Sequence, residues 1–161
     1  PLTLIGASSS VPTRPFMATG RLGPKQLDAL DRGLSQLESD PNFRVLLIHH
    51  PLSSKDSHKR LTDADALLDL LKRRGVNLIL HGHDHIHSTM WFDGPHGRIP
   101  AIGVPSASAM PHRHYPPAAY NLFSITPDGN GWRCEQRVRG FADQAAIERG
   151  EISELQRTQL I

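Results

Sequence analysis

The chain has 161 residues, enough for about one domain at roughly 150 residues per domain. Its 18 Lys and Arg residues nearly balance 16 Asp and Glu residues, which disfavours long nucleic acid as a partner. A single cysteine, Cys134, excludes an intrachain disulfide framework and a cysteine-based metal site. Neither a signal peptide nor an apolar run of the ~20 residues that span a bilayer is visible, so we expect no membrane partner and a cytoplasmic location.

The first predicted elements are a strand and a helix joined by a loop. Residues 2–6 predict a short buried strand, and residues 11–23 predict a loop because they hold turn-forming residues and little periodicity. Pro24 then occupies the first helical position, where its missing N–H costs nothing. Leucines follow at helical spacing, so we expect a helix that ends before Pro41.

The next predicted elements form a βαβ unit. Residues 45–48 and 76–80 are short apolar runs typical of parallel strands buried on both faces. Between them, Thr62 and Asp65 resemble a capping box, and Gly75 lies where a helix should end. We therefore expect a helix that joins two parallel strands.

The second half of the chain predicts strands joined by turns rich in Gly, Pro and Asp. The predicted strands are residues 89–92, 99–104, 120–125 and 132–138, the last an edge strand that carries Cys134. Residues 93–97 and 127–131 predict hairpin connections, and residues 105–117 a loop. Residues 142–157 predict a surface helix or a frayed tail.

Histidines follow both strands of the predicted βαβ unit. His49 follows the first strand, and His81 and His83 follow the second. Since the carboxyl ends of parallel strands lie at one edge of a sheet, where ligands collect, we expect these groups to meet in space. Neutral imidazole is a common ligand of divalent transition metals, so the sequence predicts a metal site at this edge.

The spacing of His83 and His85 indicates a place for two metal ions. In an extended turn the two rings lie on one side and Asp84 points to the other. Two imidazoles so placed could each hold one ion of a pair about 3.5–4 Å apart. Gly82 would allow the chain to turn sharply at the strand end.

Two segments resemble the C-terminal signature blocks of the calcineurin-like metallophosphoesterases. They are Ile-His-His-Pro at residues 48–51 and Leu-His-Gly-His-Asp-His at residues 80–85. The resemblance covers residues 2 to 104 and is loosely nearest the class III cyclic-nucleotide phosphodiesterase branch. It implies an α/β fold, in which the chain forms the C-terminal part of a four-layer αββα sandwich of two stacked mixed sheets. On this basis we expect residues 1–140 to be the C-terminal portion of such a domain and residues 141–161 a helix or tail.

The same resemblance implies a dinuclear metal centre that hydrolyses phosphoesters and favours a phosphodiesterase, with a small-molecule phosphoester as the expected substrate. The sequence leaves open whether that substrate is a cyclic nucleotide, a phospholipid-derived diester or a monoester. His49 and His83 would bind one ion and His85 the other. Mixed nitrogen and oxygen ligands suit Mn, Fe, Zn or Co. We identify no catalytic residue beyond the ligands, and expect His50 and His87 to lie near the substrate.

The remaining histidines are expected to have structural or peripheral roles. We expect His81 to be a packed residue at a strand end, and we expect His112 and His114 to lie in an exposed loop. His50 is an alternative ligand in place of His49.

The family's N-terminal blocks, Asp-x-His, Gly-Asp-x-x-Asp and Gly-Asn-His-Asp/Glu, are absent from the sequence. Two divalent ions bring four positive charges, and three neutral imidazoles offset none of them. We therefore expect the missing N-terminal half as a partner, and expect the isolated chain to be a poor catalyst that is soluble only with that half or as a homo-oligomer. The alternatives are a non-catalytic interaction module on the same scaffold and a histidine-rich metal carrier.

Overall fold

The computed structural model describes residues 2–108, 110, 115–129 and 131–161. The chain folds into two compact units. The first unit runs to Asp84 and includes Ser88–Gly103, and the second comprises His85–His87 and Val104–Ile161.

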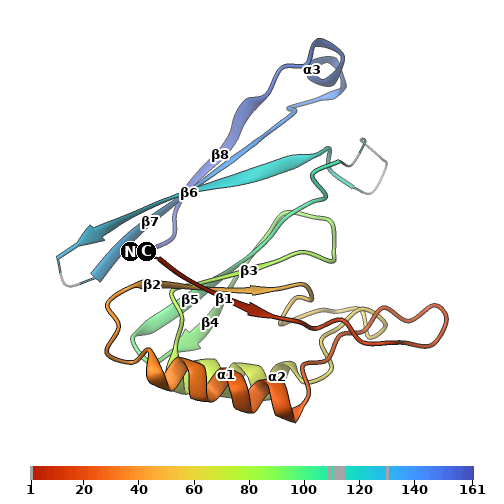
Figure 1. Ribbon diagram of the computed structural model, residues 1–161. Helices are drawn as coiled ribbons and strands as arrows, with labels where there is room; N and C mark the ends of the chain where they lie inside the picture. Colours follow the sequence, from red (N-terminus) through yellow and green to blue (C-terminus); the bar gives the residue numbers. More distant parts are fainter. Residues whose placement is uncertain (1, 109, 111–114, 130) are drawn as a thin grey trace. The chain divides into compact units, whose positions relative to one another are not determined.

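The first unit contains a five-stranded mixed sheet in the order β1-β2-β3-β5-β4. Its strands are β1 (Leu2–Ala7), β2 (Phe43–Ile48), β3 (Leu78–His81), β4 (Ser88–Gly94) and β5 (Gly97–Gly103). Strands β1, β2, β3 and β5 run parallel, and β4 pairs antiparallel with β5. Helices α1 (Pro24–Gln36) and α2 (Ala64–Arg74) lie together on one face of this sheet (Figure 1).

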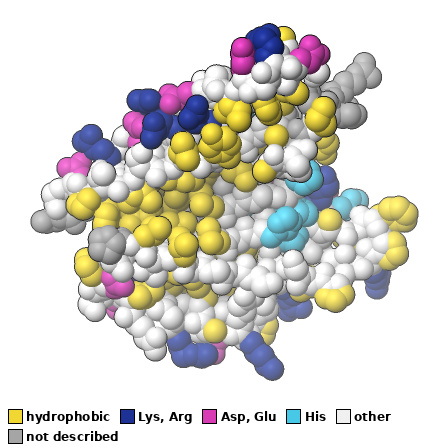
Figure 2. Space-filling view, turned by 45° about the horizontal axis from the view of Figure 1, so that its top comes forward, with side chains coloured by type: hydrophobic (Ala, Val, Ile, Leu, Met, Phe, Trp, Pro, Cys, Tyr) yellow, Lys and Arg dark blue, Asp and Glu magenta, His cyan; other side chains and the backbone are white. Residues whose placement is uncertain are grey.

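The core of this unit lies between the sheet and the two helices. Alternate residues of the strands, such as Leu46 and Ile79, pack against leucines of the helices, such as Leu34 and Leu67, and all four are almost fully buried. The opposite face of β1 and β2 keeps large apolar side chains exposed. They are Leu2, Leu4 and Leu47, which are 51%, 60% and 37% exposed. Figure 2 also shows hydrophobic side chains gathered on the surface.

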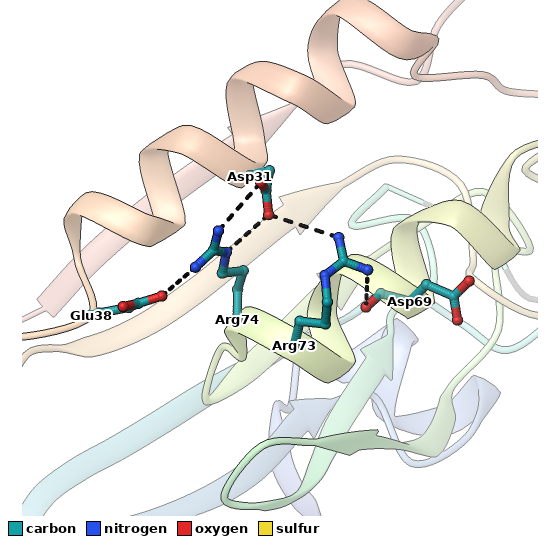
Figure 3. Close-up of polar contacts among 5 residues, drawn as sticks. All are labelled: Asp31, Glu38, Asp69, Arg73 and Arg74. Atoms are coloured by element: carbon teal, nitrogen blue, oxygen red, sulfur yellow. Dashed lines mark hydrogen bonds and ion pairs between the residues drawn. The ribbon is translucent and has the colours of Figure 1, made fainter.

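An ion-pair network links the two helices (Figure 3). Arg74 of α2 donates from Nε to a carboxylate oxygen of Asp31 on α1 at 2.9 Å, and from Nη1 to Glu38 just beyond α1. The hydrogen bond from Arg74 lowers the pKa of Asp31, and the bond to Asp31 raises the pKa of Arg74. Arg73 lies within 3.9 Å of Asp31 and donates to the carbonyl oxygen of Asp69 in its own helix. The network therefore holds the two helices side by side.

The second unit is an antiparallel sheet in the order β6-β7-β8. Its elements are β6 (Ala119–Asp128), β7 (Gly131–Gly140), helix α3 (Gln144–Arg149) and β8 (Ser153–Gln159). Asp143 caps α3 by accepting a hydrogen bond from the backbone N–H of Ala146. The chain thus passes through one short helix before it returns as the third strand.

The predicted α/β class, the positions of the strands, both helices and both hairpins are confirmed. The expected burial of the first strand, and of both faces of the second, is wrong, because Leu2, Leu4 and Leu47 are exposed. The expectation for residues 142–157 is wrong beyond the short helix α3, because Ser153–Gln159 pair with β7 as a strand. Cys134 accordingly lies in a central strand and not at an edge, and burial raises the pKa of its thiol to about 11. Among the described residues, no helix is long and apolar enough to cross a membrane.

The predicted capping box at the start of α2 is also wrong. The residue that caps the helix is Asp63, and its side chain makes no bond within the helix. Its carboxylate instead accepts hydrogen bonds from the backbone N–H groups of Leu22 and Gly23, while Thr62 donates from its hydroxyl to the carbonyl of Gly20. Both polar side chains therefore join the start of α2 to the segment that enters α1.

Candidate metal centre

The predicted meeting of the two strand ends is confirmed in the first unit. The backbone N–H of Gly82 donates to the carbonyl of His49 at 3.1 Å, which keeps the chain after β3 beside the chain after β2. As a result, Nδ1 of His83 lies 3.1 Å from Nε2 of His49. The two ring centroids are 5.0 Å apart, with the rings at 79° to one another. Two histidines that lie 34 residues apart in the chain therefore present ring nitrogens to one another.

This nitrogen pair fits two ligands of one metal ion. Nitrogen ligands of Zn²⁺ lie at about 2.0–2.1 Å in tetrahedral geometry, which separates two of them by ~3.3 Å. The observed distance between His49 and His83 is close to that value. Within the part of the chain that the structure describes, however, no group of three or more His, Cys, Asp or Glu residues could hold a metal ion. The pair therefore fits part of a metal site.

The turn that carries His83 has an uncommon backbone conformation. His83 has φ 72° and His85 has φ 57°, whereas the sequence predicted an extended turn. The backbone N–H of Asp84 donates to the carbonyl of Gly82 at 2.9 Å, which tightens the chain at this point. Gly82 itself has no positive φ, and a Cβ atom there would meet only Nδ1 of His49 at 3.9 Å, so neither backbone conformation nor space requires a glycine at this position. Left-handed residues other than glycine cost of order 1–3 kcal/mol and cluster at functional sites.

His50 is buried beside this pair, with both ring nitrogens engaged. Its Nε2 lies 3.1 Å from the carbonyl oxygen of Ala18, which only accepts, so Nε2 carries the proton. Its Nδ1 therefore accepts the hydrogen bond from the hydroxyl of Ser9, at 2.8 Å. Burial, followed by the neighbouring His83, lowers the pKa of His50 and favours its neutral form.

The other predicted histidines lie in several places. His81 is buried as expected, and its burial lowers its pKa. His85 and His87 are exposed and begin the second unit, where the ring of His85 lies 5.9 Å from that of Tyr115. His112 and His114 lie outside the described residues. Figure 2 shows histidine side chains reaching the surface of the molecule.

Three residues that contact His50, namely Ser9, Ala18 and Gly20, could not be found from the sequence. A Cβ atom on Gly20 would overlap Nδ1 of His50. All three residues lie in or beside the predicted loop of low periodicity, and no motif in that loop indicated a contact with a residue 30 or more positions away.

About half of the chain matches a known protein family. Residues 9–87 match the sequence model of the calcineurin-like phosphoesterases. The chain is 28% identical over 137 residues to a probable cyclic nucleotide phosphodiesterase from Synechococcus sp. (strain WH7803). The matched region covers 80% of this chain and 47% of that protein.

A solved structure is similar in fold. A dimetal phosphatase from Danio rerio matches with a TM-score of 0.60 and 19% identity, over 86% of this chain and 40% of that one. A Vps29 protein from Entamoeba histolytica matches 98% of this chain and 97% of its own length at 15% identity, with a TM-score of only 0.41. The chain spans less than half the length of the phosphodiesterase and of the phosphatase. Residues 9–87, which contain the strand ends and their histidines, thus belong to the calcineurin-like phosphoesterase family.

Proposed function

We propose that this chain supplies the C-terminal metal ligands of a dinuclear metal-dependent phosphodiesterase. The observation that carries the proposal is the 3.1 Å approach of His49 Nε2 and His83 Nδ1 at the carboxyl ends of two parallel strands. In this proposal both histidines bind one divalent transition-metal ion, such as Mn, Fe, Zn or Co, and His85 binds a second. When bound, such an ion pair supplies Lewis-acid activation of water and of the phosphoryl oxygens.

The protein's own contribution is to hold neutral imidazole nitrogens in place. Neutral nitrogen is the form that binds metal, and the opposed rings of His49 and His83 present it at a separation suited to one ion. His50 is less suited to the role of ligand, because its ring nitrogens already bond to Ser9 and Ala18. A role for His50 and His87 near the substrate stays a prediction.

The remaining ligands are proposed to come from an N-terminal half of the domain. Carboxylates are needed to offset the charge of two divalent ions. The described residues contain no group of three or more His, Cys, Asp or Glu residues that could hold a metal ion. The chain spans 47% of the related phosphodiesterase, and Leu2, Leu4 and Leu47 leave an apolar sheet face exposed. The four-layer sandwich implied by the resemblance would place further strands against such a face. On this view the isolated chain is a poor catalyst.

The proposed substrate is a phosphodiester of a small molecule. The related protein from Synechococcus is a probable cyclic nucleotide phosphodiesterase, and the net charge of +2 does not provide a surface that follows a nucleic-acid backbone. The second candidate function is a non-catalytic interaction module on the same scaffold. The absence of a three-ligand group among the described residues favours it.

Replacement of His83 separates these functions. In the full-length gene product, His83→Ala should abolish Mn²⁺-dependent cleavage of an aryl phosphodiester and remove at least one metal ion per chain, as measured by elemental analysis. His96→Ala is the matched control, because His96 is an exposed histidine on a hairpin of the same unit. Unchanged metal content in His83→Ala would refute the ligand assignment. A wild-type protein that binds metal but cleaves no phosphoester would favour the interaction module.

A further inference from the structure

A cradle of three residues encloses the ring of His50. Ser9 bonds to Nδ1 and also accepts from the backbone N–H of His50, and Ala18 accepts from Nε2. Gly20 lies against the ring so closely that a Cβ atom there would overlap it. Both polar ends and one side of the imidazole are therefore occupied, and the ring has one orientation available.

The cradle is itself fixed to the rest of the first unit. At Ser9, the backbone carbonyl accepts a hydrogen bond from the backbone N–H of Arg21 at 3.0 Å. At Gly20 the chain pairs with the segment before α2, since Gly20 donates to Arg60 and accepts from the N–H of Thr62. The orientation of His50 is thus set by backbone contacts at two separate points.

The fixed ring of His50 contacts both proposed ligands. Its centroid lies 4.2 Å from that of His83, at an interplanar angle of 40°, and 5.0 Å from that of His49, edge to face. Each of the three rings therefore contacts the other two. The ring of His50 is in addition bonded through its nitrogens to Ser9 and Ala18. A change in the orientation of His50 would displace the rings of His49 and His83.

We infer that His50 is a positioning residue, which holds the rings of His49 and His83 so that their facing nitrogens bind one metal ion. This inference rests on the proposed metal site. Ser9 acts through His50 and is not a nucleophile, because its side chain is only 1% exposed. Groups that orient metal-binding histidines typically change metal affinity by 10–100-fold when they are removed.

Two substitutions disturb the cradle by different physical routes without changing a proposed ligand. Ser9→Ala removes the hydrogen bond to Nδ1, and Gly20→Ala displaces the ring by steric overlap. Gly6→Ala is the matched control, because a Cβ atom there meets nothing within 4 Å. Since Gly6 shares the exposed face of Leu4 and Leu47, a second control is Gly33→Ala in α1, where a Cβ atom also meets nothing within 4 Å. The probe is Co²⁺, titrated into the metal-free full-length protein and followed by calorimetry and by the visible absorption spectrum.

Both cradle variants should bind Co²⁺ about 10–100-fold more weakly than wild type and change its visible spectrum, whereas Gly33→Ala should do neither. In the metal-free proteins, the imidazole NMR signals of His49 and His83 should also shift in both variants. Folded variants with wild-type affinity, spectrum and NMR signals, whatever their melting temperature, would overturn the role of His50. A wild-type protein that binds no Co²⁺ would instead overturn the proposed metal site, while the NMR shifts would still report whether His50 orients its neighbours.

Discussion

Two adjacent histidines at the end of β2 have opposite environments. The side chain of His49 is exposed and faces His83, whereas that of His50 is buried between Ser9 and Ala18. Successive side chains of an extended chain point to opposite sides, so one of the two had to turn toward the neighbouring loop. A single-residue shift in the end of β2 would exchange their roles. The assignment of His49 as the proposed ligand therefore depends on the bonds that hold His50.

At the residue scale, Gly103 should tolerate no side chain. A Cβ atom at Gly103 would overlap Oγ of Ser88 and lie 2.7 Å from Cε1 of His81. Because His81 is buried and has little room to move, we expect Gly103→Ala to lower the free energy of unfolding by about 1–3 kcal/mol. Urea denaturation of the full-length protein measures this loss.

The control for this prediction is Gly33→Ala in helix α1, where a Cβ atom meets nothing within 4 Å. It should be neutral or stabilise the protein by ~0.5–1 kcal/mol, since alanine is the better helix former. Equal stability of Gly103→Ala and wild type would mean that the strands separate easily at this position.

The proximity of His49 and His83 could be predicted from the sequence, but the orientation of the rings could not. The strand ends are visible as short apolar runs, and the parallel order of a βαβ unit brings them to one edge. The bonds of His50 depend on Ser9 and Ala18, which lie 41 and 32 positions earlier in a segment without periodicity. Such contacts arise from tertiary packing and leave no local pattern.

At the element scale, local patterns succeeded wherever a single helix face or strand determined the structure. The leucine spacing predicted α1, and Gly75 with φ 73° ends α2 as expected. The capping box failed because Thr62 and Asp63 bond to Gly20, Leu22 and Gly23, which are distant in sequence. A capping pattern only predicts that polar groups are available at a helix start, and a nearby loop can use them instead.

The contact between α1 and α2 should depend on Arg74. Arg74→Ala removes the bonds to Asp31 and Glu38 shown in Figure 3, so we expect a slightly lower urea midpoint at neutral pH. Lys72→Ala is the control on the exposed face of the same helix. The loss should be small, because the participating groups are partly exposed to solvent.

The stabilisation that Arg74 provides through Asp31 should depend on pH. The pKa of Asp31 is lowered in the folded protein, so its contribution is fully present above its pKa in the unfolded chain, near 3.8. The contribution is lost as the pH falls through the lower folded value. The urea midpoints of wild type and Arg74→Ala should therefore approach one another below about pH 4. A difference that stays constant from pH 7 to pH 3 would assign the effect of Arg74 to packing alone.

At the scale of the whole molecule, the third strand of the second unit was the element least visible in the sequence. Strand β8 has the sequence Ser-Glu-Leu-Gln-Arg-Thr-Gln, with a single large apolar residue, and almost all of it is exposed. Its register with β7 is set by backbone hydrogen bonds and by the short helix α3, which reverses the chain. An edge strand that buries few side chains lacks the alternation of apolar and polar residues by which strands are predicted from sequence.

The exposed apolar face of β1 and β2 predicts how the isolated chain behaves in solution. Leu4 and Leu47 are 60% and 37% exposed, and Leu2 beside them is 51% exposed. Exposed apolar patches of this kind favour association, so we expect the isolated chain to form oligomers at micromolar concentration. The double substitution Leu4→Lys with Leu47→Lys should shift it toward monomer in sedimentation velocity, whereas Leu155→Lys on β8 should not.

The same double substitution should have the opposite consequence in the full-length gene product. If the proposed N-terminal half covers this face, each lysine must be buried or must separate the two halves, so the substitution should lower the unfolding free energy by several kcal/mol. Leu155→Lys should again change little, because Leu155 is exposed on a different strand. An isolated wild-type chain that sediments as one monomer, together with a full-length protein whose stability is unaffected by the two lysines, would show that no part of the protein covers this face. The combination of better solubility in the short chain and lower stability in the long one is the result that a buried interface requires.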